Sequence, residues 1–146
     1  MRFWDASALI SLFIDEPNST AVRSIATADG SIAAWWGSPV ECCSAIARAR
    51  REGGVELREE DRLRRAVAAL AESWTEILPT VDLRHSALRL LLRHALRASD
   101  GLQLAAALVW AGGHATDQSF VCLDVKLRLA ARNEGFIVLP EDIRAL

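Results

Sequence analysis

The sequence has few cysteines, and they are not arranged for a disulfide framework or a zinc site. Its 146 residues include three cysteines, two of them adjacent (Cys42, Cys43 and Cys122). Disulfide-stabilised secreted domains carry even sets of cysteines, and zinc sites need Cys or His pairs at short, fixed spacings. A chain of 16.0 kDa also buries enough surface to fold without either device. We therefore expect buried thiols in a reducing compartment, the cytoplasm.

Long hydrophobic runs are absent as well. The longest strictly apolar stretch covers residues 104–113, about half the length of a membrane span. The amino-terminal residues MRFWD do not begin an apolar run of signal-peptide length. Internal repeats, low-complexity segments and linkers are also missing. We expect a single domain over residues 1–146 that does not associate with membranes.

The chain also lacks an excess of positive charge. The chain has 17 Lys and Arg against 19 Asp and Glu, a net charge of −2, and Lys126 is its single lysine. This balance argues against a protein that holds nucleic acid by general electrostatic attraction. Hydrophobic residues reach 51% and charged residues 25%, a composition that excludes a disordered or collagen-like chain.

What the sequence does contain is a regular alternation of short apolar segments and helical patterns. Strands are expected at 2–4, 31–35, 76–79, 120–123 and 136–139. Helices are expected from about 6 to near Pro17, and at 19–28, 38–52, 58–74, 82–96, 99–111 and 125–133. Strands separated by helices pair in parallel through right-handed crossovers. We predict a three-layer α/β/α sandwich with a mainly parallel sheet of about five strands.

Four acids stand at one edge of this predicted sheet. Asp5 and Asp124 follow strands, and Glu41 and Asp100 lie in the first turns of helices that begin on the same side. Each has a purely structural interpretation. Asp5 and Asp124 suit helix N-caps, Ser38 and Glu41 have the spacing of a capping box, and Asp100 complements a helix dipole.

Taken together, the four acids predict a metal site. Carboxylates that converge repel one another and raise one another's pKa unless a cation lies between them. Oxygen ligands without His or Cys favour a hard ion, Mg²⁺ or Mn²⁺. Such sites typically hydrolyse phosphodiesters, with the metal activating water and offsetting charge in the transition state. No separate histidine base is then required.

The same residues lie in segments that resemble the PIN-domain ribonucleases, most closely the VapC toxins of bacterial type II toxin–antitoxin pairs. The resemblance covers essentially the whole chain, in motif order. The matching segments are 5–9 (DASAL), 40–41 (VE), 97–107 (RASDGLQLAAA) and 120–124 (FVCLD). It implies an endoribonuclease in which Asp5, Glu41, Asp100 and Asp124 are both the catalytic residues and the ligands of Mg²⁺ or Mn²⁺.

Three further residues are candidates at this site. Ser7 matches a small hydroxyl residue of the family that supports the first aspartate or contacts phosphate; its alternative is an ordinary first-turn serine. Cys122 stands where many relatives have Thr, which puts one supporting hydrogen bond in doubt. Asp117 either lends an outer carboxylate or is a turn residue in the segment 116–119.

The resemblance also implies partners. They are an RNA substrate, a second copy of the chain in a homodimer, and a VapB-like antitoxin whose C-terminal segment covers the acidic site. Trp36, one residue past a strand, is the expected exposed anchor. Arg50 and Arg51 are a candidate phosphate-contacting patch. Two other functions stay open: a catalytically idle PIN-type protein-binding module, and a receiver-like domain that accepts a phosphoryl group.

Overall fold

The computed structural model describes residues 1–145, so the last residue of the predicted domain lies outside the described part. Its centre is one five-stranded sheet in the order β3-β2-β1-β4-β5, and all four neighbouring pairs are parallel. The strands are β1 (Arg2–Trp4), β2 (Ile32–Trp35), β3 (Thr75–Ile77), β4 (Ser119–Val121) and β5 (Ile137–Leu139). The predicted parallel sheet is confirmed.

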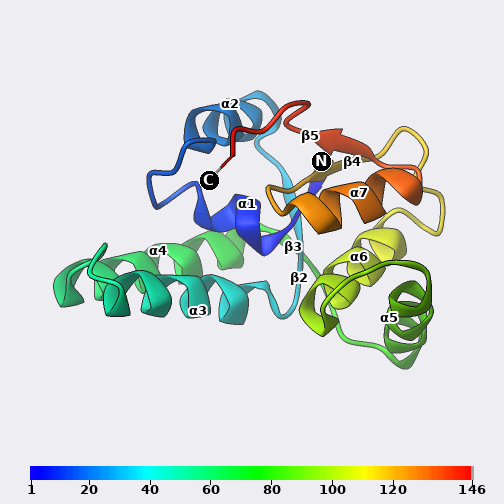
Figure 1. Cartoon of the computed structure of the whole chain (residues 1–146), viewed down its shortest axis with the longest axis horizontal. Helices are drawn as coiled ribbons and strands as arrows, with labels where there is room; N and C mark the ends of the chain where they lie inside the picture. Colours follow the sequence, from blue (N-terminus) through cyan, green and yellow to red (C-terminus); the bar gives the residue numbers. More distant parts are fainter. Residues whose placement is uncertain (146) are drawn as a thin grey trace.

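Within residues 1–145, seven helices connect and cover the strands (Figure 1). They are α1 (Ala6–Ile10), α2 (Ser19–Asp29), α3 (Ser38–Arg51), α4 (Leu57–Ser73), α5 (Val81–Arg93), α6 (Ala98–Trp110) and α7 (Val125–Asn133). No helix within residues 1–145 combines the length and apolarity that crossing a membrane requires.

The layers follow from the alternation of side chains along the strands. In β1, Phe3 packs into one buried cluster with α5, α6 and α7, while Trp4 packs into another with α1, α2, α3 and α4. Phe120 and Val121 of β4 divide between the same two clusters. Strands β1, β2 and β4 therefore bury both of their faces, which explains why they read as apolar runs, whereas β3 at the edge of the sheet is largely exposed. The three-layer α/β/α architecture is confirmed.

Two predicted helices are shorter than expected. The first ends at Ile10. Ser11 Oγ donates to the carbonyl of Ala8, and the amides of Leu12 and Phe13 donate to carbonyls three residues earlier instead of four. The helix predicted to reach residue 96 ends at Arg93, where His94 adopts an extended conformation. Both differences lie at helix ends, where side-chain contacts outweigh periodicity.

The predicted capping box is wrong. Gly37 is the N-cap of α3, and Ser38 is already its first helical residue. Ser38 Oγ instead accepts a hydrogen bond from Gln103 of α6, and Glu41 accepts one from the same side chain. Glu41 is thus directed toward the interior of the site and not back along its own helix.

Helices α3 and α4 form a hairpin that projects away from the strands (Figure 1). Glu60 of α4 is nearly buried between the two helices and forms ion pairs with Arg50 of α3 and with Arg64, the latter at 3.1 Å. Arg50, half of the predicted phosphate-contacting patch, therefore has an acidic partner within the protein.

Candidate active site

The carboxyl ends of β1 and β4 lie side by side, and this adjacency brings Asp5 to the end of β4. The amide of Asp5 donates to the carbonyl of Val121 at 3.0 Å. The Asp5 carboxylate is buried, with 3% of the residue exposed. It accepts hydrogen bonds from the amide and the hydroxyl of Ser7 at 3.0 and 2.5 Å. Asp5 is thus the N-cap of α1 and also a member of the predicted acidic site.

Asp5 and Glu41 both hold their protons more tightly than ordinary carboxyls. Burial raises the pKa of Asp5 to about 6, with a further contribution from the charge of Asp100, while hydrogen bonds from Ser7 oppose the shift. Burial raises the pKa of Glu41 to about 7, and repulsion from Asp5 and Asp100 adds to it. The charge of Asp100 therefore disfavours the ionised forms of both Asp5 and Glu41, so these acids lie near enough to interact.

Gln103 of α6 orients Glu41. Its side chain is fully buried, and Nε2 donates to Glu41 Oε1 and to Ser38 Oγ, each at 3.1 Å. Gln103 is not among the site residues predicted from the sequence. The available signal was a polar residue inside the apolar run 102–107, three positions after Asp100 and so on the same helix face.

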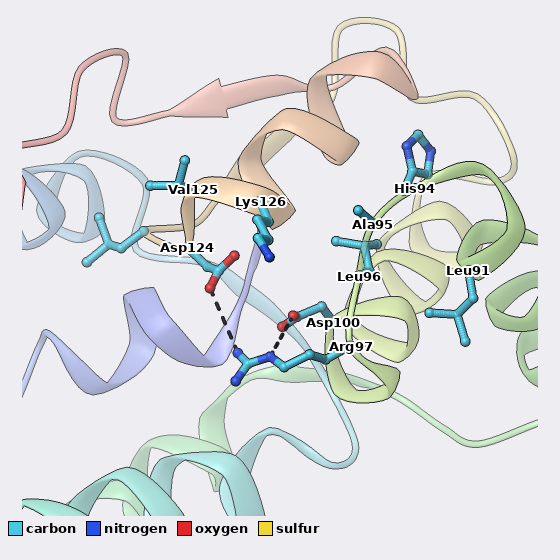
Figure 2. A pocket seen from close by; sticks show the side chains of 10 residues that line it. Leu91, His94, Ala95, Leu96, Arg97, Asp100, Asp124, Val125 and Lys126 are labelled. Atoms are coloured by element: carbon cyan, nitrogen blue, oxygen red, sulfur yellow. Dashed lines mark hydrogen bonds and ion pairs between the residues drawn. The ribbon is translucent and has the colours of Figure 1, made fainter.

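Arg97 lies between the other two acids. Its Nε is 3.3 Å from Asp100 Oδ2, and its Nη2 is 3.9 Å from Asp124 Oδ2 (Figure 2). The Asp100 side chain is 10% exposed and that of Asp124 33%, whereas that of Arg97 is 78% exposed. Exposed ion pairs of this kind contribute little free energy. The guanidinium is therefore free to leave when another cation or a phosphate arrives.

Asp124 has the second role predicted for it as well. Its carboxylate accepts a hydrogen bond from the amide of Leu127 at 2.9 Å, which makes it the N-cap of α7. Capping occupies Oδ1, whereas Oδ2 faces Arg97. Structural and chemical roles thus coexist on different oxygens of one side chain.

Ser7 and Cys122 donate hydrogen bonds to the carboxylate of Asp5. Ser7 Oγ accepts a hydrogen bond from the amide of Leu123 at 2.9 Å while it donates to Asp5. Cys122 Sγ donates to Asp5 Oδ2 at 3.5 Å. Burial raises the pKa of the Cys122 thiol, so it stays protonated as a donor. A thiol therefore supplies the contact that the missing threonine hydroxyl put in doubt.

Asp117 is not brought to this site. It is exposed, has a left-handed φ of 65°, and precedes the first residue of β4. It therefore lies at the amino end of the strand, whereas the other acids gather at carboxyl ends. The proposed outer carboxylate at this position is incorrect, because the chain must cross the length of β4 to reach Asp124. The turn interpretation describes the residue.

The side chains present fit a hard divalent cation. Asp5, Glu41, Asp100 and Asp124 offer only oxygen donors. Burial raises the pKa values of Asp5 and Glu41, and a cation beside them would favour their charged forms. Within residues 1–145, no three acidic, His or Cys side chains are already gathered as a ligand set. The hydrogen bonds from Ser7 and Gln103 and the guanidinium of Arg97 occupy the carboxylates instead.

A pocket of about 770 Å³ opens beside Asp100 and Asp124 (Figure 2). Arg97 and Lys126 provide its positive charge, and Leu96 and Val125 are among its apolar side chains. This volume lies within the range of about 300–1,000 Å³ that is typical of ligand pockets. The acidic site therefore has a neighbouring space large enough for a substrate group.

The chain is similar to known proteins in its structure, whereas the sequence comparisons found no match. No family model matches the sequence, and no curated protein matches it. The fold resembles VapC20 from Mycobacterium tuberculosis, a Sarcin-Ricin loop cleaving toxin, with a TM-score of 0.68, 17% identity and coverage of 94% of this chain and 97% of that one.

Two further solved structures are similar. FitAcB from Neisseria gonorrhoeae matches with a TM-score of 0.65, 13% identity and coverage of 94% and 96%. A toxin–antitoxin complex from Klebsiella pneumoniae matches with a TM-score of 0.59, 17% identity and coverage of 86% and 88%. The chain therefore shares with these structures the PIN-like α/β fold that its motifs predicted.

Proposed function

We propose that this protein is an endoribonuclease that hydrolyses RNA phosphodiester bonds with Mg²⁺ or Mn²⁺ and acts as the toxin of a toxin–antitoxin pair. The observation that carries the proposal is the gathering of four acids at one sheet edge. Asp5 and Asp124 follow the adjacent strands β1 and β4. Arg97, at the start of α6, lies 3.3 Å from Asp100 and 3.9 Å from Asp124. Gln103 of α6 hydrogen-bonds Glu41. A fold shared with a toxin that cleaves the Sarcin-Ricin loop supports it.

The four carboxylates are the residues that would hold the cation. When bound, the cation supplies positive charge against the phosphate and makes an attacking water more acidic. The protein holds Asp5 in place through Ser7 and Cys122, and Glu41 through Gln103. These supports reduce the freedom of the ligands before substrate arrives, which is how a rigid scaffold lowers the cost of binding.

We also propose a VapB-like antitoxin as partner, a homodimer as the assembly, and the cytoplasm as the location. The similarity to a solved toxin–antitoxin complex supports the first. Trp36 is 52% exposed and Val40 is 72% exposed, near the start of α3. These apolar side chains, together with the acidic site, suit a segment that has both apolar and basic residues.

The test is cleavage of RNA by the purified protein. We expect cleavage with Mn²⁺ or Mg²⁺, none with EDTA, and a loss of at least about 100-fold in Asp100→Asn, because a ligand charge is removed. Asp117→Asn is the matched control, since Asp117 lies at the opposite sheet edge, and should cut as the wild type does. Full cleavage by Asp100→Asn, or by wild type in EDTA, contradicts the site. No cleavage under any condition favours the idle protein-binding module.

A further inference from the structure

Two pockets meet at Asp124. The larger one lies on the α6 and α7 side, as described above. The second, of about 270 Å³, lies on the α1 and α3 side and is lined by Ser7, Glu16 and Arg48 among others. Leu123 and Asp124 line both pockets. Asp124 is thus shared by two hollows, one toward α6 and α7 and one toward α1 and α3.

Each hollow contains a cationic side chain that the protein does not neutralise. Within residues 1–145, neither Arg48 nor Lys126 forms an ion pair, and both are exposed. Arg50 and Arg64, by contrast, are paired with Glu60. Lys126 extends from α7 into the space that Arg97 and Asp100 also face (Figure 2). One positive charge is therefore available on each side of the carboxylates.

We propose that an unpaired RNA strand crosses the site over Asp124, with Arg48 contacting a backbone phosphate on one side and Lys126 contacting one on the other. This rests on the proposed function and names the path of its substrate. The charges alternate along that path in the order positive, acidic, positive. Such an order places flanking phosphates on cations and the phosphate between them at the acidic residues.

The two pockets differ in volume and lining, and these differences indicate which part of the RNA each would hold. The larger pocket has an aliphatic wall from Leu91, Leu96 and Val125, which suits the face of one base turned out of its stack. The smaller pocket has about a third of that volume and suits sugar and phosphate alone. Proteins read bases in this manner only where RNA is unpaired, because a helix hides its base faces.

Substitution of Glu16 should have the opposite effect on RNA affinity, a gain instead of a loss. It is the acidic side chain of the smaller pocket outside the four predicted ligands, and it has no role in holding them. Its carboxylate repels a phosphate bound at Arg48, so Glu16→Gln should tighten RNA binding. A structural role for this pocket alone does not predict a gain of affinity.

The experiment measures binding of a fluorescent, unpaired RNA oligonucleotide by anisotropy at several salt concentrations. Asp5→Asn is the background, with Mg²⁺ present, so that the RNA stays intact. We expect Arg48→Ala and Lys126→Ala each to lower the slope of log K against log salt by about 0.7. Arg48→Lys and Lys126→Arg should restore the slope. Arg132→Ala, on α7, and Arg58→Ala, on α4, which packs against α3, lie outside the pockets; they are the matched controls and should leave the slope unchanged.

Two outcomes overturn the proposal and are distinguishable from failure of the proposed function. If wild-type protein cuts RNA but Arg48→Ala and Lys126→Ala keep the wild-type slope, the path is wrong and the nuclease stands. If a fully paired duplex of the same sequence binds as tightly as the single strand, the requirement for unpaired RNA is wrong. If wild-type protein neither cuts nor binds RNA, the proposed function itself fails.

Discussion

Asp5 has two neighbours that hydrogen-bond its carboxylate and an environment that disfavours its charge. Asparagine is also a good N-cap, so Asp5→Asn keeps the start of α1 and removes the repulsion. Asp5→Asn therefore tests the charge of the carboxylate without removing the helix cap. The same is true of Asp100, which does not cap its own helix.

The stability of the metal-free protein should depend on pH through Asp5 and Glu41. Their folded-state pKa values of about 6 and about 7 lie above the ordinary 3.8 and 4.5. The folded state therefore binds more protons than the unfolded state within this window. The free energy of unfolding should then fall as pH rises from about 4 to about 7, by roughly 5 kcal/mol at most.

Urea unfolding in EDTA across this pH range measures the effect. Asp5→Asn should flatten the dependence and raise stability near neutral pH, because it removes one of the two shifted groups. Asp117→Asn, exposed and far from the site, should keep the wild-type dependence. An Asp5→Asn curve parallel to wild type would show that burial at this position does not shift the carboxyl.

Arg97 should compete with a metal ion for Asp100 and Asp124. Arg97→Ala removes the guanidinium from between the two carboxylates, so Mn²⁺ should bind more tightly. The gain should reach about fivefold at most, since an exposed ion pair contributes about 0.2–1 kcal/mol. Isothermal titration calorimetry measures it. Arg93→Ala is the control, because Arg93 pairs with Glu134 instead; weaker Mn²⁺ binding by Arg97→Ala would refute the competition.

At the scale of elements, Gln103 connects α6 to α3. Replacement by leucine keeps the size but leaves Ser38 and Glu41 without their shared donor. We expect a loss of about 1–3 kcal/mol in the free energy of unfolding, because buried polar groups lose a partner. Chemical denaturation measures it. Gln118→Leu is the control at a half-buried loop position whose side chain makes no hydrogen bond within residues 1–145; equal losses in both variants would contradict the connecting role.

The sequence predicted the central elements well because β1, β2 and β4 are buried on both faces and read as apolar runs. It also predicted Asp5 and Asp124, since an acid directly after such a run lies at the sheet edge where ligands bind. It did not predict the partners of these acids. Arg97 and Gln103 act across α6–α7 and α6–α3 contacts, which local periodicity does not describe. The capping box was wrong for the same reason. Gln103, which is distant in sequence, hydrogen-bonds Glu41, the residue that local spacing had paired with Ser38.

At the scale of the whole molecule, cation binding should stabilise the fold. The four carboxylates come from segments spread between residues 5 and 124, so the unfolded chain does not gather them. A ligand that binds only the folded state raises the free energy of unfolding by about 2.7 kcal/mol at 100 times its dissociation constant.

Thermal unfolding with and without Mn²⁺ measures this coupling. We expect a higher midpoint with Mn²⁺, reversal by EDTA, and little response in Asp100→Asn. Asp117→Asn should respond as the wild type does. An equal rise in Asp100→Asn would mean that Mn²⁺ stabilises the protein elsewhere.

The pairing of β1 with β4 joins segments that are more than a hundred positions apart, and the Ser7–Leu123 hydrogen bond spans 116 of them. During synthesis, the first strand leaves the ribosome long before its neighbour exists. A growing chain therefore lacks part of the acidic site until the segment around Asp124 has emerged. In the proposed ribonuclease, this order of assembly delays a complete active site until most of the chain has been synthesised.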